Sequence, residues 1–229
     1  NKNKFNLKEI NKKTGLNLDA TFTATKILWL KINYPQIYNK IVNNKYLIGT
    51  LDTWIIWNLT KGKIYSTDAS NASRTLLCNT KLQEWDKSLI NQFQLKKIIL
   101  PKIKKNYDNF GKIDKSFFGA EINIKASIGD QQASLFGNEC LKMGDLKITL
   151  GTGSFLWLNK GSKFLPKNDS GCLETLAWYI NKPVYASEGF VIMAGALLDY
   201  FIKKLNYASN FKNLEKKSSS FKKNNIFTI

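Results

Sequence analysis

The sequence predicts an α/β fold, and three observations support this prediction. Segments with the apolar spacing of a buried helix face alternate along the chain with segments of strand-like alternation. Hydrophobic residues make up 43% and aromatic residues 13% of the 229 positions, which is enough for a packed core and argues against global disorder. Glycine-containing turns separate the segments, and we find no internal repeat.

The first half of the chain is predicted to be mainly helical after a polar, turn-rich start at residues 1–17. From Thr23 onward, apolar side chains recur at the spacing of one buried helix face, and a proline separates this helix from a second, short one. The next helix is expected to begin at Asp52, because a carboxylate there is a suitable N-cap. Residues 81–97 form a further helical segment, with Asp86 near its N-terminus.

The second half is predicted to alternate strands with helices. A strand over 122–128 leads into a helix over 131–138, and a hairpin follows in which Leu146, Ile148 and Leu150 alternate with polar residues. The remaining segments are, in order, strand over 173–187, an apolar helix over 189–203, a polar connection over 208–225 and a strand-like end over 227–229. We place a domain boundary near 137–144, which predicts domains over 1–137 and 138–229.

The charge is strongly basic, since 35 lysine and arginine residues oppose 17 acidic ones and give a net charge of +18. Such a balance is typical of nucleic-acid partners. However, Arg74 is the only arginine, and arginine is the preferred side chain for bidentate contacts to bases and phosphates. The abundant lysine, asparagine and isoleucine match A/T-rich codons, so we rank compositional bias roughly three to one above nucleic-acid binding.

The sequence lacks the residues that several classes of protein and site require. The most apolar run, 190–198, is nine residues long, whereas a membrane-spanning helix needs about 20. The chain has no histidine, and its three cysteines are far apart, which argues against histidine-based catalysis, a zinc site and a disulfide framework. With no secretory signal in view, we expect free thiols and a cytoplasmic location.

Asp130 is the first candidate for chemistry. It follows strand-forming residues and precedes a helix, and ligands of α/β sheets bind at the carboxyl ends of strands. A carboxylate there can accept the proton of a substrate hydroxyl, and Gln131 beside it offers amide groups that suit a polyol. From the residues alone, capping of the next helix explains Asp130 at least equally well.

Two glycine-bearing segments are candidates for phosphate contact. In Gly151-Thr152-Gly153, backbone N–H groups can approach a phosphate and the threonine adds a donor, but ordinary hairpin turns also favour glycine, and about one such lone motif in five is functional. Gly195 inside a helix costs roughly 1 kcal/mol relative to alanine, which close approach of a nucleotide or of another helix would explain.

Arg74 is expected to pair with a carboxylate in a structural role.

Together these and neighbouring segments resemble the FGGY carbohydrate kinase family of the actin-like ATPase superfamily. The resemblance is carried by residues 22–33, 49–54, 67–77, 129–133, 150–155 and 187–196. Their order and spacing agree with the family, and the segment 71–75 is more similar to the glycerol kinases in it than to the pentulose kinases. The resemblance implies a ribonuclease-H-like α/β fold, with 1–137 ending the first, substrate-binding domain and 138–229 beginning the second, nucleotide-binding domain.

The resemblance also implies an activity, namely transfer of the γ-phosphoryl group of ATP, with Mg²⁺, to a primary hydroxyl of glycerol. Asp130 matches the general base of such kinases and, with Gln131, contacts the substrate, while Thr21 and Phe155 are expected at the polyol pocket. The residues expected at ATP are Gly151, Thr152, Gly153, Gly195 and Asp199. No residue of this chain is expected to bind the metal directly.

The chain also departs from the family pattern. Thr21 stands where glycerol kinases often have a tyrosine, and Asp199 stands where a glutamine often contacts the nucleotide. Family members are much longer, and their Asp-Gly-Thr phosphate motif and Arg-Glu substrate pair do not occur in this sequence. We therefore expect an internal fragment, inactive alone, of a homo-oligomeric glycerol-kinase-like enzyme.

Two alternatives remain open. The first is a kinase of another small polyol or ketose from the same family, which a substrate panel would distinguish. The second is a catalytically dead basic binding protein derived from such a kinase, for which nucleic-acid binding with a steep salt dependence would be the sign. The intact Asp130, Gln131 and glycine turn argue mildly against a non-functional remnant.

Overall fold

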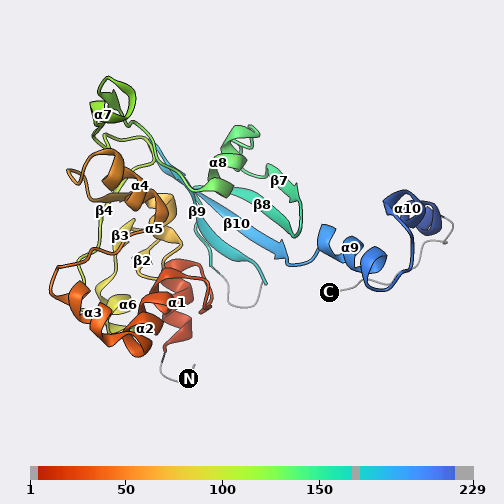
Figure 1. Ribbon diagram of the computed structural model, residues 1–229, viewed down its shortest axis with the longest axis horizontal. Coiled ribbons are helices and arrows are strands. Elements are labelled where there is room, and N and C mark those ends of the chain that lie inside the picture. Colours follow the sequence, from red (N-terminus) through yellow and green to blue (C-terminus); the bar gives the residue numbers. More distant parts are fainter. Residues whose placement is uncertain (1–4, 167–170, 220–229) are drawn as a thin grey trace. The chain divides into compact units, whose positions relative to one another are not determined.

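The computed structural model describes residues 5–166 and 171–219 and shows a mixed α/β chain, as predicted (Figure 1). Contacts divide the chain into two units. The first unit comprises Asn1–Lys147 and Trp157–Glu188, and the second comprises Ile148–Leu156 and Gly189–Ile229. Within the two described ranges, no helix combines the length and the apolar character needed to cross a membrane.

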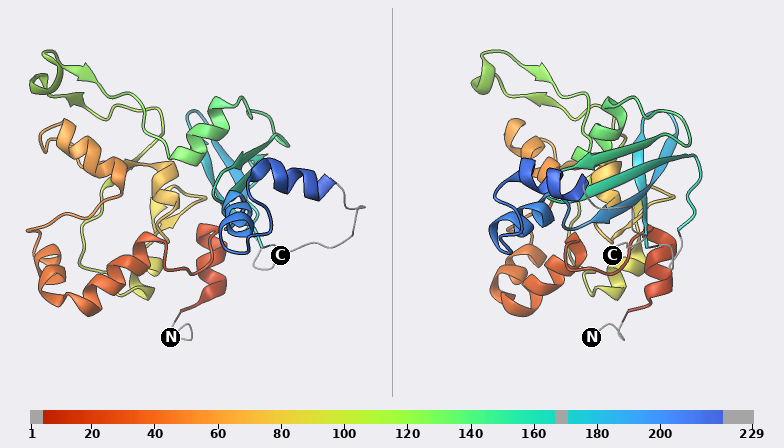
Figure 2. Two further views of the ribbon diagram at one scale, coloured as in Figure 1. Left: turned by 45° about the vertical axis from the view of Figure 1, so that its right-hand side comes forward. Right: turned by 90° about the vertical axis from the view of Figure 1, so that its right-hand side faces the viewer.

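Helices make up most of the beginning of the first unit (Figure 2). They are α1 (Leu7–Thr14), α2 (Thr23–Asn33), α3 (Pro35–Val42), α4 (Leu51–Leu59), α5 (Ala69–Ser73) and α6 (Lys87–Gln92). Helices α2 and α3 confirm the two helices expected there. The turn-rich start expected over 1–17 is wrong where α1 lies, because Asn6 caps that helix and its Ile10 is fully buried.

Two further expectations for these helices need correction. Helix α4 begins at Leu51 with Thr50 as its N-cap, so Asp52 lies in the first turn, where its carboxylate accepts a hydrogen bond from Thr67 Oγ1 at 2.8 Å. The helix expected over 81–97 is only α6. It starts at its Asp86 cap and stops before Gln94, whose φ of 55° is left-handed.

Short strands connect the helices of the first unit. Strand β1 (Ser66–Asp68) pairs in parallel with β4 (Lys102–Lys104), and β2 (Cys78–Asn79) pairs antiparallel with β3 (Glu84–Trp85). Strands β5 (Lys112–Ile113) and β6 (Ile122–Asn123) form a small ribbon that carries α7 (Lys115–Phe118) at its tip (Figure 2). A buried cluster includes residues from α1, α2, α3 and α6, among them Ile10, Ile27, Tyr38 and Leu89.

The strand expected over 122–128 is therefore mostly wrong, because β6 ends at Asn123. Its continuation is held by backbone hydrogen bonds to a loop instead: Asp108 N donates to Lys125 O at 3.0 Å, and Phe110 N donates to Ile124 O at 2.9 Å. The alternation of apolar residues does not reflect a buried strand face here, since Ile122 is 46% exposed.

The larger sheet has the strand order β7–β8–β10–β9. Its strands are β7 (Leu146–Leu150), β8 (Ser154–Gly161), β9 (Leu173–Tyr179) and β10 (Pro183–Val191). The predicted hairpin at the Gly-Thr-Gly turn and the predicted strand over 173–187 are thus confirmed. In the first unit, β9 is almost entirely buried and packs against α5 and against α8 (Asp130–Gly137), the helix expected over 131–138.

In the described part of the second unit, helices follow strand β10. Strand β10 continues to Val191, so the helix expected over 189–203 is shortened to α9 (Gly195–Lys203). Part of the polar connection expected over 208–225 is wrong, because α10 (Phe211–Ser219) occupies it. The expected end strand over 227–229 lies outside the described residues.

Candidate functional site

Asp130 lies at the start of α8. The N-cap of this helix is Gly129, so Asp130 is the first helical residue and does not itself take the N-cap position. Its side chain is exposed, and Oδ1 accepts a hydrogen bond from the Gln131 backbone N–H at 2.6 Å. A carboxylate in the first turn is favoured by the helix dipole and, being exposed, can accept a proton from a bound hydroxyl.

The two glutamines after Asp130 have different surroundings. Gln132 is buried, and its Nε2 donates to Leu176 O of β9 at 3.5 Å. Gln131 is half-buried, and its Oε1 accepts a hydrogen bond from Lys147 Nζ at 2.9 Å. Gln132 therefore packs α8 against the sheet, whereas Gln131 is the glutamine whose amide can serve a ligand beside Asp130.

Asp68, at the end of β1, is the centre of a buried polar network that the sequence analysis missed. Its side chain is inaccessible to solvent, and Oδ1 accepts hydrogen bonds from Ser70 N and Asn106 Nδ2, each at 2.8 Å. Its Oδ2 accepts from Asn71 Nδ2 at 2.6 Å and from Ser127 Oγ at 2.9 Å. These donors satisfy a carboxylate that would otherwise be costly to bury.

This network extends to the candidate site. The Ser70 hydroxyl donates to Asp68 Oδ1 and accepts a hydrogen bond from the Gly129 backbone N–H at 2.9 Å. Asn106 Nδ2 also donates to Ser127 O at 2.9 Å. The chain on the N-terminal side of Asp130 is thus held by buried side chains. An aspartate with serine and asparagine two and three residues later is a local N-cap signal for Asp68, but nothing local indicates the contact with Gly129.

Thr21 precedes α2 and is exposed, and its backbone N–H donates to Asp19 Oδ1 at 2.8 Å. The neighbouring Phe22 is buried, with the guanidinium carbon of Arg74 5.4 Å from its ring centroid. Arg74 Nη2 lies 2.7 Å from Glu188 Oε2 of the sheet, so the carboxylate partner expected for Arg74 is present. Arg74 thus contacts both Glu188 and Phe22, the residue that follows Thr21.

The glycines expected at a phosphate come together in the second unit. The Gly195 N–H donates to Gly151 O at 2.9 Å, and the N–H groups of Ala194 and Ala196 donate to Thr152 O at 2.8 and 3.1 Å. A Cβ on Gly195 would lie 2.6 Å from Gly151 O. The close approach expected at Gly195 is therefore, in this structure, an approach of the Gly-Thr-Gly turn, and Gly195 opens α9 instead of interrupting a helix.

The other two residues expected in the second unit have ordinary surroundings. Asp199 lies on α9 and forms an ion pair with Lys203 one turn later, at 3.1 Å and largely exposed. Such pairs contribute little to stability. Phe155 lies on β8 and is half-buried.

Comparison with known proteins identifies the family. A model described as the N-terminal domain of the FGGY family of carbohydrate kinases matches residues 1–137. The chain belongs to the FGGY family of carbohydrate kinases. Among curated FGGY relatives, the glycerol kinase of Thermoanaerobacter sp. is 44% identical over 210 residues, which covers 91% of this chain and 42% of the relative. The glycerol kinase of Borreliella afzelii is 44% identical over 214 residues, covering 93% and 42%.

Solved FGGY structures have the same fold. A crystal structure of Plasmodium falciparum glycerol kinase with ADP superposes with a TM-score of 0.88 at 35% identity, covering 96% of this chain and 44% of that one. A xylulose kinase from Lactobacillus acidophilus, at 20% identity and a TM-score of 0.83, shows the fold alone. The predicted similarity to the glycerol kinases is thus confirmed, and the chain spans less than half the length of these relatives.

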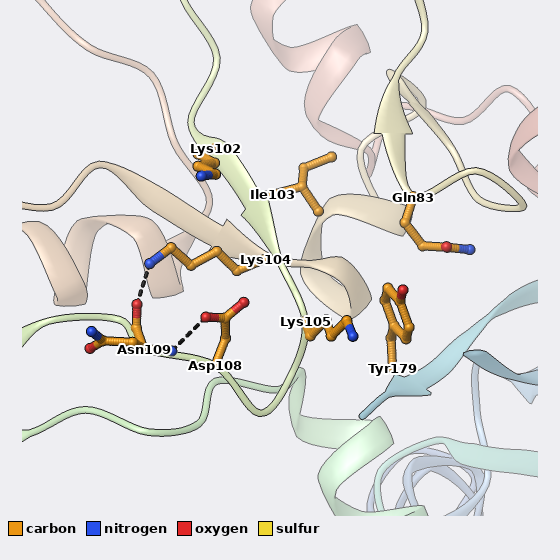
Figure 3. Close-up of a pocket in the computed structure, with 8 residues that line it drawn as sticks. All are labelled: Gln83, Lys102, Ile103, Lys104, Lys105, Asp108, Asn109 and Tyr179. Carbon is orange, nitrogen blue, oxygen red and sulfur yellow. Dashed lines mark hydrogen bonds between the residues drawn. The ribbon is translucent and has the colours of Figure 1, made fainter. Parts of the chain in front are cut away.

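An open pocket of about 330 Å³ lies elsewhere in the first unit of this FGGY chain (Figure 3). It is lined by Gln83, Lys102, Ile103, Lys104, Lys105, Asp108, Asn109 and Tyr179. Lys104 Nζ donates to Asn109 O, and Lys105 Nζ lies 4.9 Å from the Tyr179 ring centroid. None of the residues expected at the site lines this pocket, and two of its three lysines already contact neighbouring protein groups.

Proposed function

We propose that this chain supplies the general base, polyol-binding side chains and a phosphate-contacting turn of an ATP-dependent kinase that acts on a primary hydroxyl of glycerol. The observation that carries the proposal is Asp130, an exposed carboxylate in the first turn of α8 whose preceding backbone is tied to the buried Asp68 network. The 44% identity to glycerol kinases supports glycerol as the substrate.

The proposed reaction is an in-line phosphoryl transfer. The Asp130 carboxylate takes the proton of the attacking hydroxyl, whose oxygen forms a bond to the γ-phosphorus of ATP. The bond from that phosphorus to the β,γ-bridging oxygen breaks, and ADP leaves. Gln131 holds a substrate hydroxyl, and Thr21 and Phe155 border the polyol.

The second unit is proposed to contact ATP. Gly151, Thr152 and Gly153 approach the phosphates through their backbone, the Thr152 hydroxyl adds a donor, and Gly195 and Asp199 of α9 lie at the nucleotide. Mg²⁺ in kinases is held by one or two carboxylates and the phosphates. We assign no metal ligand within this chain and route no step through the metal.

We also propose how the chain fits into a whole kinase. Residues 1–137 would end a first, substrate-binding domain of ribonuclease-H-like fold, and 138–229 would begin a second, nucleotide-binding domain. The match of the family's N-terminal-domain model to residues 1–137 supports this division. The complete enzyme would be a cytoplasmic homo-oligomer.

The test is a chimeric kinase in which the 210 aligned residues of the Thermoanaerobacter glycerol kinase are replaced by those of this chain. We expect ATP-dependent phosphorylation of glycerol. Substituting Asp130→Asn should lower kcat about 10²–10⁴-fold, whereas Asp108→Asn, which changes a loop carboxylate, should leave it unchanged. A folded, ATP-binding chimera that leaves glycerol untouched would overturn the proposal.

A substrate panel in the same chimera tests the alternative substrate. The exposed Thr21 is smaller than the tyrosine expected at its position, which favours a polyol or ketose bulkier than glycerol. If the specificity constant for a tetritol or ketopentose exceeds that for glycerol, the substrate must be reassigned within the family. Substitution Thr21→Tyr should then shift the preference back toward glycerol.

A further inference from the structure

Lys147 is buried at a position where the strand pattern predicts an outward-facing side chain. Its neighbours in β7, Leu146 and Ile148, are 51% and 52% exposed, whereas Lys147 is only 6% exposed. Lysine is almost never so buried unless its ammonium is paired. A lysine turned inward between two outward-facing apolar residues therefore needs a partner that compensates for its lost hydration.

That compensation comes from the start of α8 and its surroundings. Lys147 Nζ donates to Gln131 Oε1 at 2.9 Å. Burial is the largest influence and lowers the pKa of Lys147, while the carboxylates of Asp130 and Glu188 act in the opposite direction. The carboxylates of Asp130 on α8 and Glu188 on β10 thus both attract this ammonium.

The contact determines what Gln131 can offer to a ligand. An ammonium group only donates hydrogen bonds, so the atom of the carboxamide that faces Lys147 must be its oxygen. The Nε2 group, on the other branch of the same planar carboxamide, is then the part left to face a ligand. Gln131 is thereby fixed as a donor of N–H groups, which suits the oxygen of a polyol hydroxyl.

We propose that Lys147 is a positioning residue of the polyol site, whose buried ammonium orients the Gln131 carboxamide so that its N–H donors face a substrate hydroxyl beside Asp130. This inference rests on the proposed function. It assigns to Lys147 no contact with the substrate and no proton transfer. Lys147 affects the substrate only through Gln131, so its substitution should have no further effect once the Gln131 carboxamide has been removed.

The first test uses the 229-residue chain and measures side-chain amide dynamics by ¹⁵N NMR. The Gln131 amide should be rigid in the unsubstituted chain and in Lys147→Arg, and mobile in Lys147→Met, which keeps the length but removes the charge and donor. The Gln132 amide, bonded to Leu176 O, should stay rigid in all three. A Gln131 amide that is already mobile in the unsubstituted chain would overturn the inference.

The second test measures kinetics in the chimeric kinase. Lys147→Met should raise KM for the polyol about tenfold, the cost of a lost hydrogen bond to a charged group, and leave KM for ATP unchanged. Lys147→Arg should recover most of the loss, and Lys142→Met, at an exposed lysine, should have no effect. Thermal melts of each variant separate these effects from misfolding.

The decisive variant combines two substitutions. The double variant Lys147→Met with Gln131→Ala should have the same KM for the polyol as Gln131→Ala alone, because Lys147 acts through that carboxamide. The inference would be overturned if the two substitutions raised KM for the polyol additively. It would also be overturned if Lys147→Met raised KM for ATP as much as KM for the polyol. An unsubstituted chimera without activity would instead overturn the proposed function, so the two failures are distinguishable.

Discussion

At the scale of single residues, Asp68 is a charged side chain that the first unit buries among several hydrogen-bond donors, which replace its water. Asp68 has no exposed surface and accepts hydrogen bonds from Ser70, Asn71, Asn106 and Ser127. Every one of these donors is directed at a carboxylate. The chemical nature of this one side chain therefore determines whether the network is satisfied.

Substitution Asp68→Asn should destabilise the first unit by about 2–4 kcal/mol, because an amide group would oppose donors that now meet a carboxylate oxygen. Urea denaturation of the 229-residue chain measures this change in the free energy of unfolding. Asp108→Asn is the control and should change it less, because that loop carboxylate is only half-buried and accepts its hydrogen bond from the adjacent Asn109 N–H. Equal stability of the two variants would show that the network contributes nothing.

At the scale of elements, two helices distant in sequence are joined by charged groups. Lys13 of α1 lies 3.0 Å from Asp86, the N-cap of α6, and 3.0 Å from Glu9. Burial would raise the pKa of Asp86, but hydrogen bonds from Ser88, the Leu89 backbone N–H and Lys13 outweigh it and hold the pKa at about 2. The ionised form of Asp86 is therefore stabilised by folding.

This depressed pKa predicts an acid dependence of stability. The contribution of Asp86, about 2 kcal/mol, is present above its unfolded pKa near 3.8 and is lost as the pH falls through the folded value of about 2. Denaturation curves should show this loss between pH 4 and pH 2. In Asp86→Asn the loss over that interval should be smaller by the same amount. An unchanged acid dependence would contradict the assignment.

The turn of the second unit gives another prediction at this scale. A Cβ on Gly195 would meet the backbone atom Gly151 O at 2.6 Å, whereas a Cβ on Gly137 at the end of α8 would meet nothing within 4 Å. Gly195→Ala should therefore displace the turn and lower the hydrogen-exchange protection of the Gly195 and Ala196 amides about tenfold. Gly137→Ala should leave that protection unchanged and stabilise α8 slightly. Retained protection in Gly195→Ala would contradict the tight packing.

At the scale of the whole molecule, exposed apolar side chains and the positive net charge have opposite effects on self-association. Leu150 at the end of β7 and Ile192 just after β10 are 80% and 77% exposed, and the net charge is +18. Exposed apolar faces of this kind favour association, while like charges oppose it. Adding salt weakens only the repulsion.

The 229-residue chain should therefore self-associate more strongly as salt rises from about 0.05 to 0.5 M, because screening shortens the range of the repulsion. Sedimentation velocity measures the change in size distribution. A monomer at all salt concentrations would show that these apolar faces do not associate. Nucleic-acid binding, in contrast, would weaken steeply over the same range, which distinguishes a basic binding protein from a kinase segment.

Local patterns were sufficient for several elements of this chain. Periodic apolar spacing predicted α2, α3 and the hairpin of β7 and β8, because the signals for these elements lie within a few residues of each other. A helix was expected over 131–138, and α8 starts one residue earlier, at Asp130. Prediction failed where an element forms only if another segment of the chain pairs with it. The apolar alternation after Ile122 produced almost no strand, because the backbone beyond Asn123 bonds to an irregular loop at Asp108 and Phe110 instead of to a regular strand.

The candidate site shows the same division. The alternation of segments predicted the α/β class, and the resemblance of the motifs indicated the family, with Asp130 and Gln131 as candidate residues. The bond from Gly129 to Ser70, the ion pair of Arg74 with Glu188 and the inward turn of Lys147 could be known only from the folded chain. The residues in these contacts are up to 114 positions apart in the sequence (188 − 74). Which side chains become buried together depends on how distant elements pack, and the local spacing of residues carries no information about that packing.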